Sequence, residues 1–436
     1  MKGFIDRCKA YCLAGNVLDR NDIISLLDIP VGSADDLYMR SAAHETAMAL
    51  TKRRGYIWSA VGMDYEPCGM NCSFCSFGEK WGLIKEPHKA SEEEITKQIK
   101  AFADGGAAYI VLRTTELYDI NTLIDCAAGI IKTLPAGCRL ILNTGELDIL
   151  TAERVKKAGV YGVYHALRLR EGTDTPFDPQ TRMDTMRAAV SAGLKLTSLV
   201  EPLGPEHTSE EIADSFLTAV LCGASISGVM ARFPVPGTPK GSTKMLENEV
   251  IAHTAAALRL SGGRVIEDIC VHPASNEALE SGANVMVVEA GAIPRDADFS
   301  KSEWNGLDMA RACAMLLDAG YKISLKTAVR DEKCPCMGGN LEKFIQPIIL
   351  HILKKQPLNG YAVRNAIASY VTYEDTVPDM AATYRYLKTL KSRGLLDFND
   401  GVYSVNESGK ECLNDWISTI QKYSATLDAL KDQLEK

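Results

Sequence analysis

The sequence predicts an α/β protein, made of a (β/α)8 TIM-type barrel and a C-terminal winged-helix domain. From about Gly55 to Lys322, short apolar runs alternate eight times with longer amphipathic stretches, the pattern of a parallel sheet covered by helices. The 436 residues fit one barrel plus a smaller domain. After Lys326 the pattern changes to helices around a short hairpin. A doubly wound open sheet is the alternative to a closed barrel.

The chain is predicted to have four parts. Residues 1–50 form an N-terminal helical cap, 51–326 the barrel, 327–341 a cysteine-containing linker and 342–436 the winged-helix domain. Apolar runs with the length and composition of strands mark the eight barrel strands. These strands are predicted at 57–63, 109–113, 140–144, 162–169, 195–203, 226–233, 265–271 and 284–289.

Helix starts and a turn support these boundaries. Ser91 with Glu94, and Thr208 with Glu211, have the spacing of a capping box and begin two of the barrel helices. In the last part, Asn399-Asp400-Gly401 is typical of a tight hairpin turn. Helices are expected at 344–355, 361–370 and 379–393, the hairpin at 396–405, and a last helix from about 411.

Composition limits the classes of function. The formal net charge of -8 disfavours a chain that mainly binds phosphate backbones, because such binding needs an excess of Lys and Arg. No apolar run approaches the roughly 18 residues of a membrane span, so we expect a cytoplasmic protein that does not enter a membrane. The 13 cysteines, an odd number, fit a reducing compartment with free, metal-bound or catalytic thiols.

The strongest chemical signal is the segment from Cys68 to Cys75, which follows the first predicted strand. Its cysteines, Cys68, Cys72 and Cys75, have the spacing C-x-x-x-C-x-x-C. Three thiolates can hold a four-iron cluster and leave one iron open to another ligand. A zinc site is the structural alternative, but zinc takes four closed ligands and no fourth ligand lies nearby in the sequence.

This motif, with an aromatic residue before its last cysteine, resembles that of the radical S-adenosylmethionine (SAM) superfamily. The resemblance implies a [4Fe-4S] cluster whose open iron binds SAM and yields a 5′-deoxyadenosyl radical. It also implies an electron donor such as a flavodoxin or ferredoxin. By the same analogy, Phe74, Ser76 and Phe77 would lie beside the adenine.

Residues 15–325 are similar to the biotin-synthase-like branch of that superfamily. The similar segments include 177–186 around Arg182, 191–195, 201–208 with Glu206, 232–239 and 281–284. The resemblance implies that Arg182 pairs with the SAM carboxylate, that Glu171 holds the ribose, and that Glu206 belongs to a cofactor-binding loop. A guanidinium suits the first task because its fork matches a carboxylate.

The chain also departs from biotin synthase. That family binds a second cluster through cysteines on the second, third and fifth strands, and the corresponding strands here contain none. Cys334 and Cys336 in the linker, with Cys270 as a third ligand, could form an auxiliary cluster instead. Two free thiols in a linker are the equally weighted alternative.

Polar residues at the carboxyl ends of the predicted strands are the substrate candidates, because chemistry in such barrels sits there. Several arginines among them suggest an anionic substrate. The candidates are Arg113, Glu116, Asn143, Glu146, His165, Arg168, Glu201 and Arg232.

The last 95 or so residues resemble PadR-type winged-helix regulators. Basic residues on the predicted recognition helix, such as Arg385 and Lys388, would face DNA. Acidic residues roughly balance the basic ones in this domain, so a protein partner or a homodimer contact is preferred to DNA.

The sequence thus predicts a radical SAM enzyme that abstracts hydrogen from a small anionic substrate. The preferred reaction is sulfur insertion in cofactor biosynthesis, as in biotin and lipoyl synthases. One alternative is a radical carbon-skeleton rearrangement without a second cluster, as in methylornithine-synthase-like relatives. The other is a SAM- or redox-responsive winged-helix transcription regulator.

Overall fold

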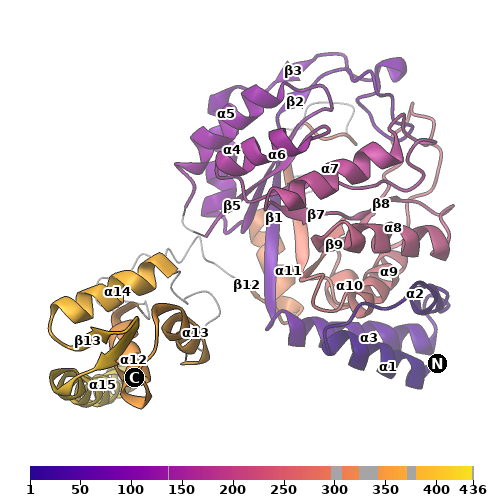
Figure 1. The fold of residues 1–436 in the computed structure, drawn as a ribbon. Coiled ribbons are helices and arrows are strands. Elements are labelled where there is room, and N and C mark those ends of the chain that lie inside the picture. The colour runs from indigo at the N-terminus through magenta and orange to yellow at the C-terminus, as the bar shows by residue number, and fades with distance from the viewer. Residues whose placement is uncertain (136, 296–306, 324–341, 371–379, 435–436) are drawn as a thin grey trace. The chain divides into compact units, whose positions relative to one another are not determined.

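The computed structural model describes residues 1–135, 137–295, 307–323, 342–370 and 380–434. The chain divides into two compact units, Met1–Arg330 and Asp331–Lys436. Figure 1 traces the chain through both units.

The first unit is a closed barrel of eight parallel strands. β1 pairs with β4 and β11, β4 to β7 pair in sequence, and β7 pairs with β9. β9 pairs with β10, and β10 with β11, which closes the ring. The predicted barrel is therefore confirmed, and the open-sheet alternative is wrong. The strands are β1 (Arg54–Gly62), β4 (Tyr109–Arg113), β5 (Arg139–Asn143), β6 (Gly162–Tyr164), β7 (Lys195–Thr197), β9 (Ala224–Ala231), β10 (Asp268–His272) and β11 (Val285–Gly291).

Helices cover the outside of the ring (Figure 1). The two predicted capping boxes are present, because Ser91 with Glu94 and Thr208 with Glu211 exchange reciprocal hydrogen bonds at the starts of α4 and α8. The outer helices are α4 (Glu92–Asp104), α5 (Ile120–Ile131), α6 (Ile149–Lys157), α7 (Pro179–Ser191), α8 (Ser209–Leu221), α9 (Asn248–Ser261), α10 (Asn276–Leu279) and α11 (Met309–Asp318).

Two strands differ from the prediction near the mouth of the barrel. The fourth strand ends at Tyr164 instead of residue 169, and the fifth is split into β7 and β8 (Val200–Leu203). Beyond these strands the backbone still pairs locally, since the Leu169 N–H donates to the backbone carbonyl of Glu201 over 2.6 Å. The short elements of this unit are β2 (Asp64–Tyr65), η1 (Glu79–Trp81), β3 (His88–Lys89) and β12 (Lys322–Ile323).

The amino end of the barrel is closed by helices and by buried polar contacts. α1 (Lys2–Leu13), α2 (Arg20–Leu27) and α3 (Ala34–Leu50) lie at the end where β1 begins (Figure 1). The buried Arg259 donates to the Gly282 carbonyl over 2.9 Å and to Asn284 Oδ1 over 2.6 Å. A ligand must therefore enter from the opposite, carboxyl end.

The second unit contains the predicted helices and hairpin. Asp400 and Gly401 both have positive φ, 51° and 79°, which gives the tight turn between β13 and β14. The last helix begins at Glu407, four residues earlier than predicted. The winged-helix and PadR-like assignment of this unit stays a prediction. Its elements are α12 (Glu342–Lys355), α13 (Gly360–Tyr370), α14 (Met380–Ser392), β13 (Leu396–Asn399), β14 (Val402–Val405) and α15 (Glu407–Leu434).

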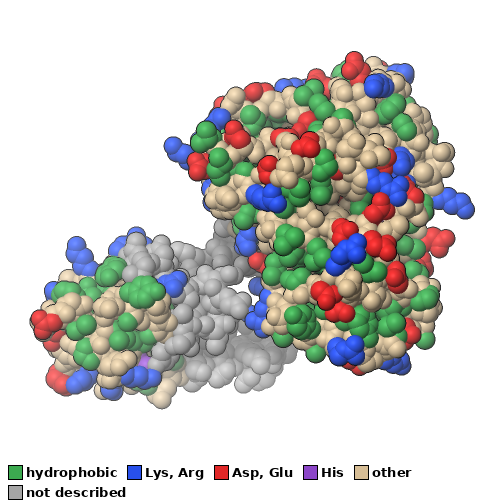
Figure 2. Space-filling model, turned by 45° about the vertical axis from the view of Figure 1, so that its right-hand side comes forward, with side chains coloured by type: hydrophobic (Ala, Val, Ile, Leu, Met, Phe, Trp, Pro, Cys, Tyr) green, Lys and Arg blue, Asp and Glu red, His purple; other side chains and the backbone are tan. Residues whose placement is uncertain are grey.

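The surface carries both signs of charge. On the face that Figure 2 shows, acidic and basic side chains are interspersed over the barrel unit, as a total of 48 Lys and Arg against 56 Asp and Glu leads one to expect. Among the described residues, no helix has both the length and the apolar character needed to cross a membrane.

Candidate active site

The three cysteines of the motif lie together in the loop after β1 and β2, at the carboxyl end of the barrel. Burial raises the pKa of Cys72 to about 11 and that of Cys75 to about 12, and the charges of the neighbouring motif cysteines contribute to both shifts. The three sulfurs are thus close enough to affect one another. A bound cation reverses this effect, because it stabilises thiolates.

The donor set of this loop suits a cluster better than a single ion. In the described part of the chain, one group of three side chains has all its ligand atoms within 4.8 Å of one another, and it is Asp174, Glu206 and His207. The three cysteines do not form such a group. A structural zinc ion takes four closed ligands, whereas three thiolates can hold a four-iron cluster and leave one iron open.

Backbone contacts hold this loop to three separate parts of the barrel mouth. The Ser76 N–H and hydroxyl both donate to the Pro294 carbonyl, after β11, over 2.8 Å. The Ser73 N–H donates to the Asp174 carbonyl, after β6, over 2.8 Å, and the Lys240 N–H, after β9, donates to the Ser73 carbonyl over 3.0 Å. These contacts anchor the loop to connections that follow three different strands.

A cavity of about 200 Å³ lies inside the barrel mouth, beside the three cysteines. Its upper walls carry charged and polar side chains from the strand ends. Its lower part, which we name the cavity floor, consists of lining residues that also pack in the core inside the barrel. The floor residues are Trp58, Ala60, Val111, Tyr164, Leu199, Met230, Cys270 and Val287.

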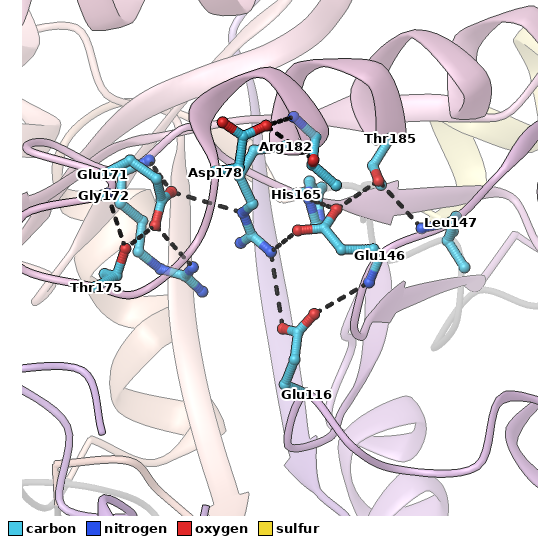
Figure 3. A network of polar contacts seen from close by, with 12 residues as sticks. Glu116, Glu146, Leu147, His165, Glu171, Gly172, Thr175, Asp178, Arg182 and Thr185 are labelled. Atoms are coloured by element: carbon cyan, nitrogen blue, oxygen red, sulfur yellow. Dashed lines mark hydrogen bonds and ion pairs between the residues drawn. The ribbon is translucent and has the colours of Figure 1, made fainter. Parts of the chain in front are cut away.

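Arg182 on α7 is surrounded by carboxylates (Figure 3). Its side chain is 2% exposed, and its Nη1 lies 2.9 Å from Glu146 and 3.7 Å from Glu116. Its Nε lies 3.6 Å from Glu171. The predicted pairing with a SAM carboxylate stays a prediction, because in this structure Glu146 holds the guanidinium.

Glu171, the predicted ribose ligand, is fixed by its own loop. It accepts a hydrogen bond from the Arg168 backbone N–H over 2.8 Å and another from the Thr175 hydroxyl. Arg168 also places its Nη1 3.8 Å from Glu171 and its Nε 3.8 Å from Glu201. The Arg168 guanidinium therefore faces the cavity between two carboxylates without a close ion pair to either.

Glu146 gives the fold a dependence on pH. Burial raises its pKa, but His165, whose Nε2 lies 3.2 Å away, and Arg182 outweigh burial and lower it to about 2. A folded-state pKa below the unfolded value near 4.5 adds stability above pH 4.5, and this is lost as the pH falls towards 2. We expect Glu146→Gln to flatten the fall in unfolding free energy over this interval, measured by urea titration at several pH values. An unchanged slope would contradict the assignment.

Glu289 on β11 is the centre of a charged group that the sequence analysis missed. It accepts hydrogen bonds from Arg113 and Arg295, and His272 Nε2 lies 3.1 Å from it. Arg113 also donates to the Ala292 carbonyl. Both Glu289 and His272 stand at carboxyl ends of barrel strands, so the rule that selected Arg113 would have found them.

Arg232, predicted to bind substrate, holds Glu206 instead. Its guanidinium donates to both oxygens of Glu206, over 2.6 and 2.7 Å, and Lys240 donates to the same carboxylate over 3.2 Å. These cations lower the pKa of Glu206 well below its usual range. Glu206 thus orders the residues after β9, beside the cysteine loop.

Glu201 is buried on β8, at the edge of the cavity floor. Burial raises its pKa to about 8, although the charge of Arg295 lowers it. The Tyr164 hydroxyl donates a hydrogen bond to it. A carboxyl group in this position keeps its proton at neutral pH.

The structure brings most of the predicted site residues to one cavity. Six other predicted residues do not line the cavity but lie close to its lining. They are Glu146, His165, Ser76, Glu171, Arg182 and Glu206. Cys334 and Cys336 lie outside the described residues. The predicted residues that line the cavity are Cys68, Cys72, Cys75, Phe74, Phe77, Arg113, Glu116, Asn143, Arg168, Glu201, Arg232 and Cys270.

The fold and the site define a βα-barrel protein with a three-cysteine loop over a charged cavity at the carboxyl ends of its strands. No family model matches the chain. It is 23% identical over 303 residues to a biotin synthase of Nitrosopumilus maritimus, covering 65% of this chain and 90% of that protein. It is also 23% identical over 339 residues to biotin synthase 2 of Corynebacterium diphtheriae, covering 73% and 95%.

Two solved structures share the fold. Methylornithine synthase (PylB) matches with a TM-score of 0.61 and 17% identity over 73% of this chain and 97% of its own. HydG, a maturase of the [FeFe]-hydrogenase, matches with a TM-score of 0.62 and 12% identity over 92% and 95%. Together the relatives and neighbours support the radical SAM superfamily, and with it a radical SAM enzyme that uses a [4Fe-4S] cluster and SAM.

Proposed function

We propose that this protein is a radical SAM enzyme that abstracts hydrogen from an unactivated carbon of a small anionic substrate. The observation that carries the proposal is the three-cysteine loop, whose cysteines all line the charged cavity at the carboxyl ends of the strands. Cys68, Cys72 and Cys75 would hold the cluster. When bound, the cluster and SAM would supply a 5′-deoxyadenosyl radical.

The chain's own residues would orient these cofactors. Phe74 and Phe77 line the cavity beside the cysteines and would pack against the adenine, while Ser76 fixes their loop to Pro294. Glu171 would hold the ribose hydroxyls. Arg182 would bind the SAM carboxylate, which would replace one of the protein carboxylates that now surround the guanidinium.

Among the cavity arginines, Arg168 is the best candidate to bind the substrate anion. Arg113 and Arg232 make short hydrogen bonds to Glu289 and Glu206. Arg168 has carboxylates only at 3.8 Å, so its guanidinium is free to form a closer, bidentate contact. An electron donor such as a flavodoxin or ferredoxin would complete the system.

Two types of reaction remain candidates. Sulfur insertion would use an auxiliary cluster on Cys270, Cys334 and Cys336. Carbon-skeleton rearrangement needs no second cluster. Among the described residues, Cys270 is the one cysteine besides the trio that lines the cavity, so an auxiliary cluster would depend on Cys334 and Cys336.

Iron analysis of anaerobically reconstituted protein tests both levels of the proposal. A brown protein with about four irons per chain, which forms 5′-deoxyadenosine from SAM after reduction, would support the rearrangement type. About eight irons per chain would support sulfur insertion. A colourless protein with one tetrahedral zinc ion would overturn the radical SAM assignment.

A further inference from the structure

Three protic groups lie at the cavity floor or at its edge, and the proposed formation of the 5′-deoxyadenosyl radical does not use them. They are the Cys270 thiol on β10, the Tyr164 hydroxyl on β6 and the Glu201 carboxyl on β8. They come from three different strands, and all three side chains line the same cavity as the cysteine loop. A hydroxyl and a carboxyl group inside an apolar core need a hydrogen-bond partner, and Tyr164 and Glu201 supply one to each other.

We propose that the cavity floor returns a hydrogen atom to the product radical, with Cys270 as the donor and the Tyr164–Glu201 pair as its proton supply. This inference rests on the proposed function, because hydrogen abstraction leaves a carbon radical in the cavity. It goes beyond that function by assigning the end of the reaction to residues of this chain.

The surroundings of Cys270 keep its S–H bond intact. Its side chain is 1% exposed, and it packs in the core inside the barrel with Trp58 and Leu199. Burial raises the pKa of Cys270 far above its usual range. The group is therefore a neutral thiol, the form that can give up a hydrogen atom.

The Tyr164–Glu201 pair stores a proton at the same depth. One hydrogen bond joins the two groups, and it needs one proton. Glu201, 3% exposed, keeps its own proton at neutral pH because burial opposes its ionisation. The pair thus holds one proton more than its hydrogen bond requires, and that proton is available inside the cavity.

The proposed step balances in two stages. First, the Cys270 S–H bond breaks homolytically, a C–H bond forms on the product carbon, and a thiyl radical remains on Cys270. Second, the thiyl radical takes one electron from the low-potential iron-sulfur or flavin donor that also reduces the cluster, and one proton from Glu201. Water outside the cavity then reprotonates Glu201.

Aromatic rings continue from the cavity floor through the barrel interior. The ring centroid of Tyr164 lies 5.9 Å from that of Trp58, and Trp58 lies 5.7 Å from Tyr109. Tyr109 in turn lies 6.2 Å from Tyr161, which is half-buried and carries the exposed Arg139 on its ring. The column therefore joins the cavity floor to the amino end of the barrel.

Deuterium labelling tests the donor without knowledge of the substrate, because with SAM alone the 5′-deoxyadenosyl radical would occupy the cavity in place of the product radical. Reconstituted full-length protein, equilibrated in D2O, is reduced with dithionite in the presence of SAM alone, and the 5′-deoxyadenosine is analysed by mass spectrometry. We expect the wild-type product to carry one deuterium from the S–D bond. Cys270→Ser keeps the size of the side chain, but its O–H bond is too strong to donate, so the labelled fraction should fall several-fold. Cys313→Ala on α11, away from the cavity, is the matched control.

Two further readouts separate this proposal from its rivals. Iron content should be the same in Cys270→Ser and wild type, whereas a loss of about four irons per chain would make Cys270 a cluster ligand and overturn the proposal. Glu201→Gln should keep the label in the first turnover but slow later turnovers. If the Cys270→Ser variant gave the same deuterium-labelled fraction of 5′-deoxyadenosine as the wild type, the role of Cys270 would be overturned, but the proposed function would stand. Wild-type protein that forms no 5′-deoxyadenosine would overturn the proposed function as well.

Discussion

Replacing Cys72 with alanine is expected to abolish the formation of 5′-deoxyadenosine from SAM and to remove most of the bound iron. Two cysteines cannot hold a four-iron cluster, so the loss of one ligand removes the whole group. The fold should survive, because Cys72 lies in a mouth loop and is partly exposed. Iron analysis, product detection by mass spectrometry and circular dichroism measure the three expectations.

A matched variant makes this test specific. Cys126→Ala changes a partly buried cysteine on α5, away from the motif, and should keep wild-type iron and product formation. Product formation by Cys72→Ala above the level of protein-free controls would contradict the assignment of the motif.

Replacing Arg182 with methionine should lower the free energy of unfolding by about 3–5 kcal/mol, because it leaves buried carboxylates without their cation. Glu146 and Glu171 lie within 3.6 Å of this guanidinium, whose side chain is 2% exposed. Urea denaturation followed by circular dichroism measures the loss. Arg182→Lys keeps the charge and should recover part of it.

The same helix offers a control for the Arg182 variant. Arg187 on α7 is 53% exposed and pairs with Asp184 on the surface, so Arg187→Met should cost less than about 1 kcal/mol. Equal losses in the two variants would mean that the buried carboxylates do not depend on Arg182.

Local patterns predicted the barrel because each βα unit carries its own signal. Apolar strand runs and the capping boxes at Ser91 and Thr208 are readable over a few residues, and the structure agrees with them. The predicted fourth strand was too long because its apolar run continues past Tyr164, although the chain there leaves the sheet to form the mouth. The spacing of apolar residues along the sequence does not show where a strand leaves the sheet.

The cysteine motif was predictable for a similar reason, since its spacing is local. The pairing of the charged side chains could not be predicted from local spacing. Arg113, Arg182 and Arg232 were selected as ligand-binding groups, and the structure gives each a carboxylate partner from a distant segment, such as Glu289 for Arg113 at a separation of 176 residues. Only the closed barrel brings these partners together, so a sequence pattern alone could not assign them.

The three anchors of the cysteine loop also impose an order on maturation. Pro294, Asp174 and Lys240 belong to connections that follow three different strands, and they meet the loop only after the ring has closed. A short peptide with the same cysteines would lack this support. Insertion of iron and sulfide should therefore be the last step in the biogenesis of the protein, and the delivery machinery must recognise an already folded barrel.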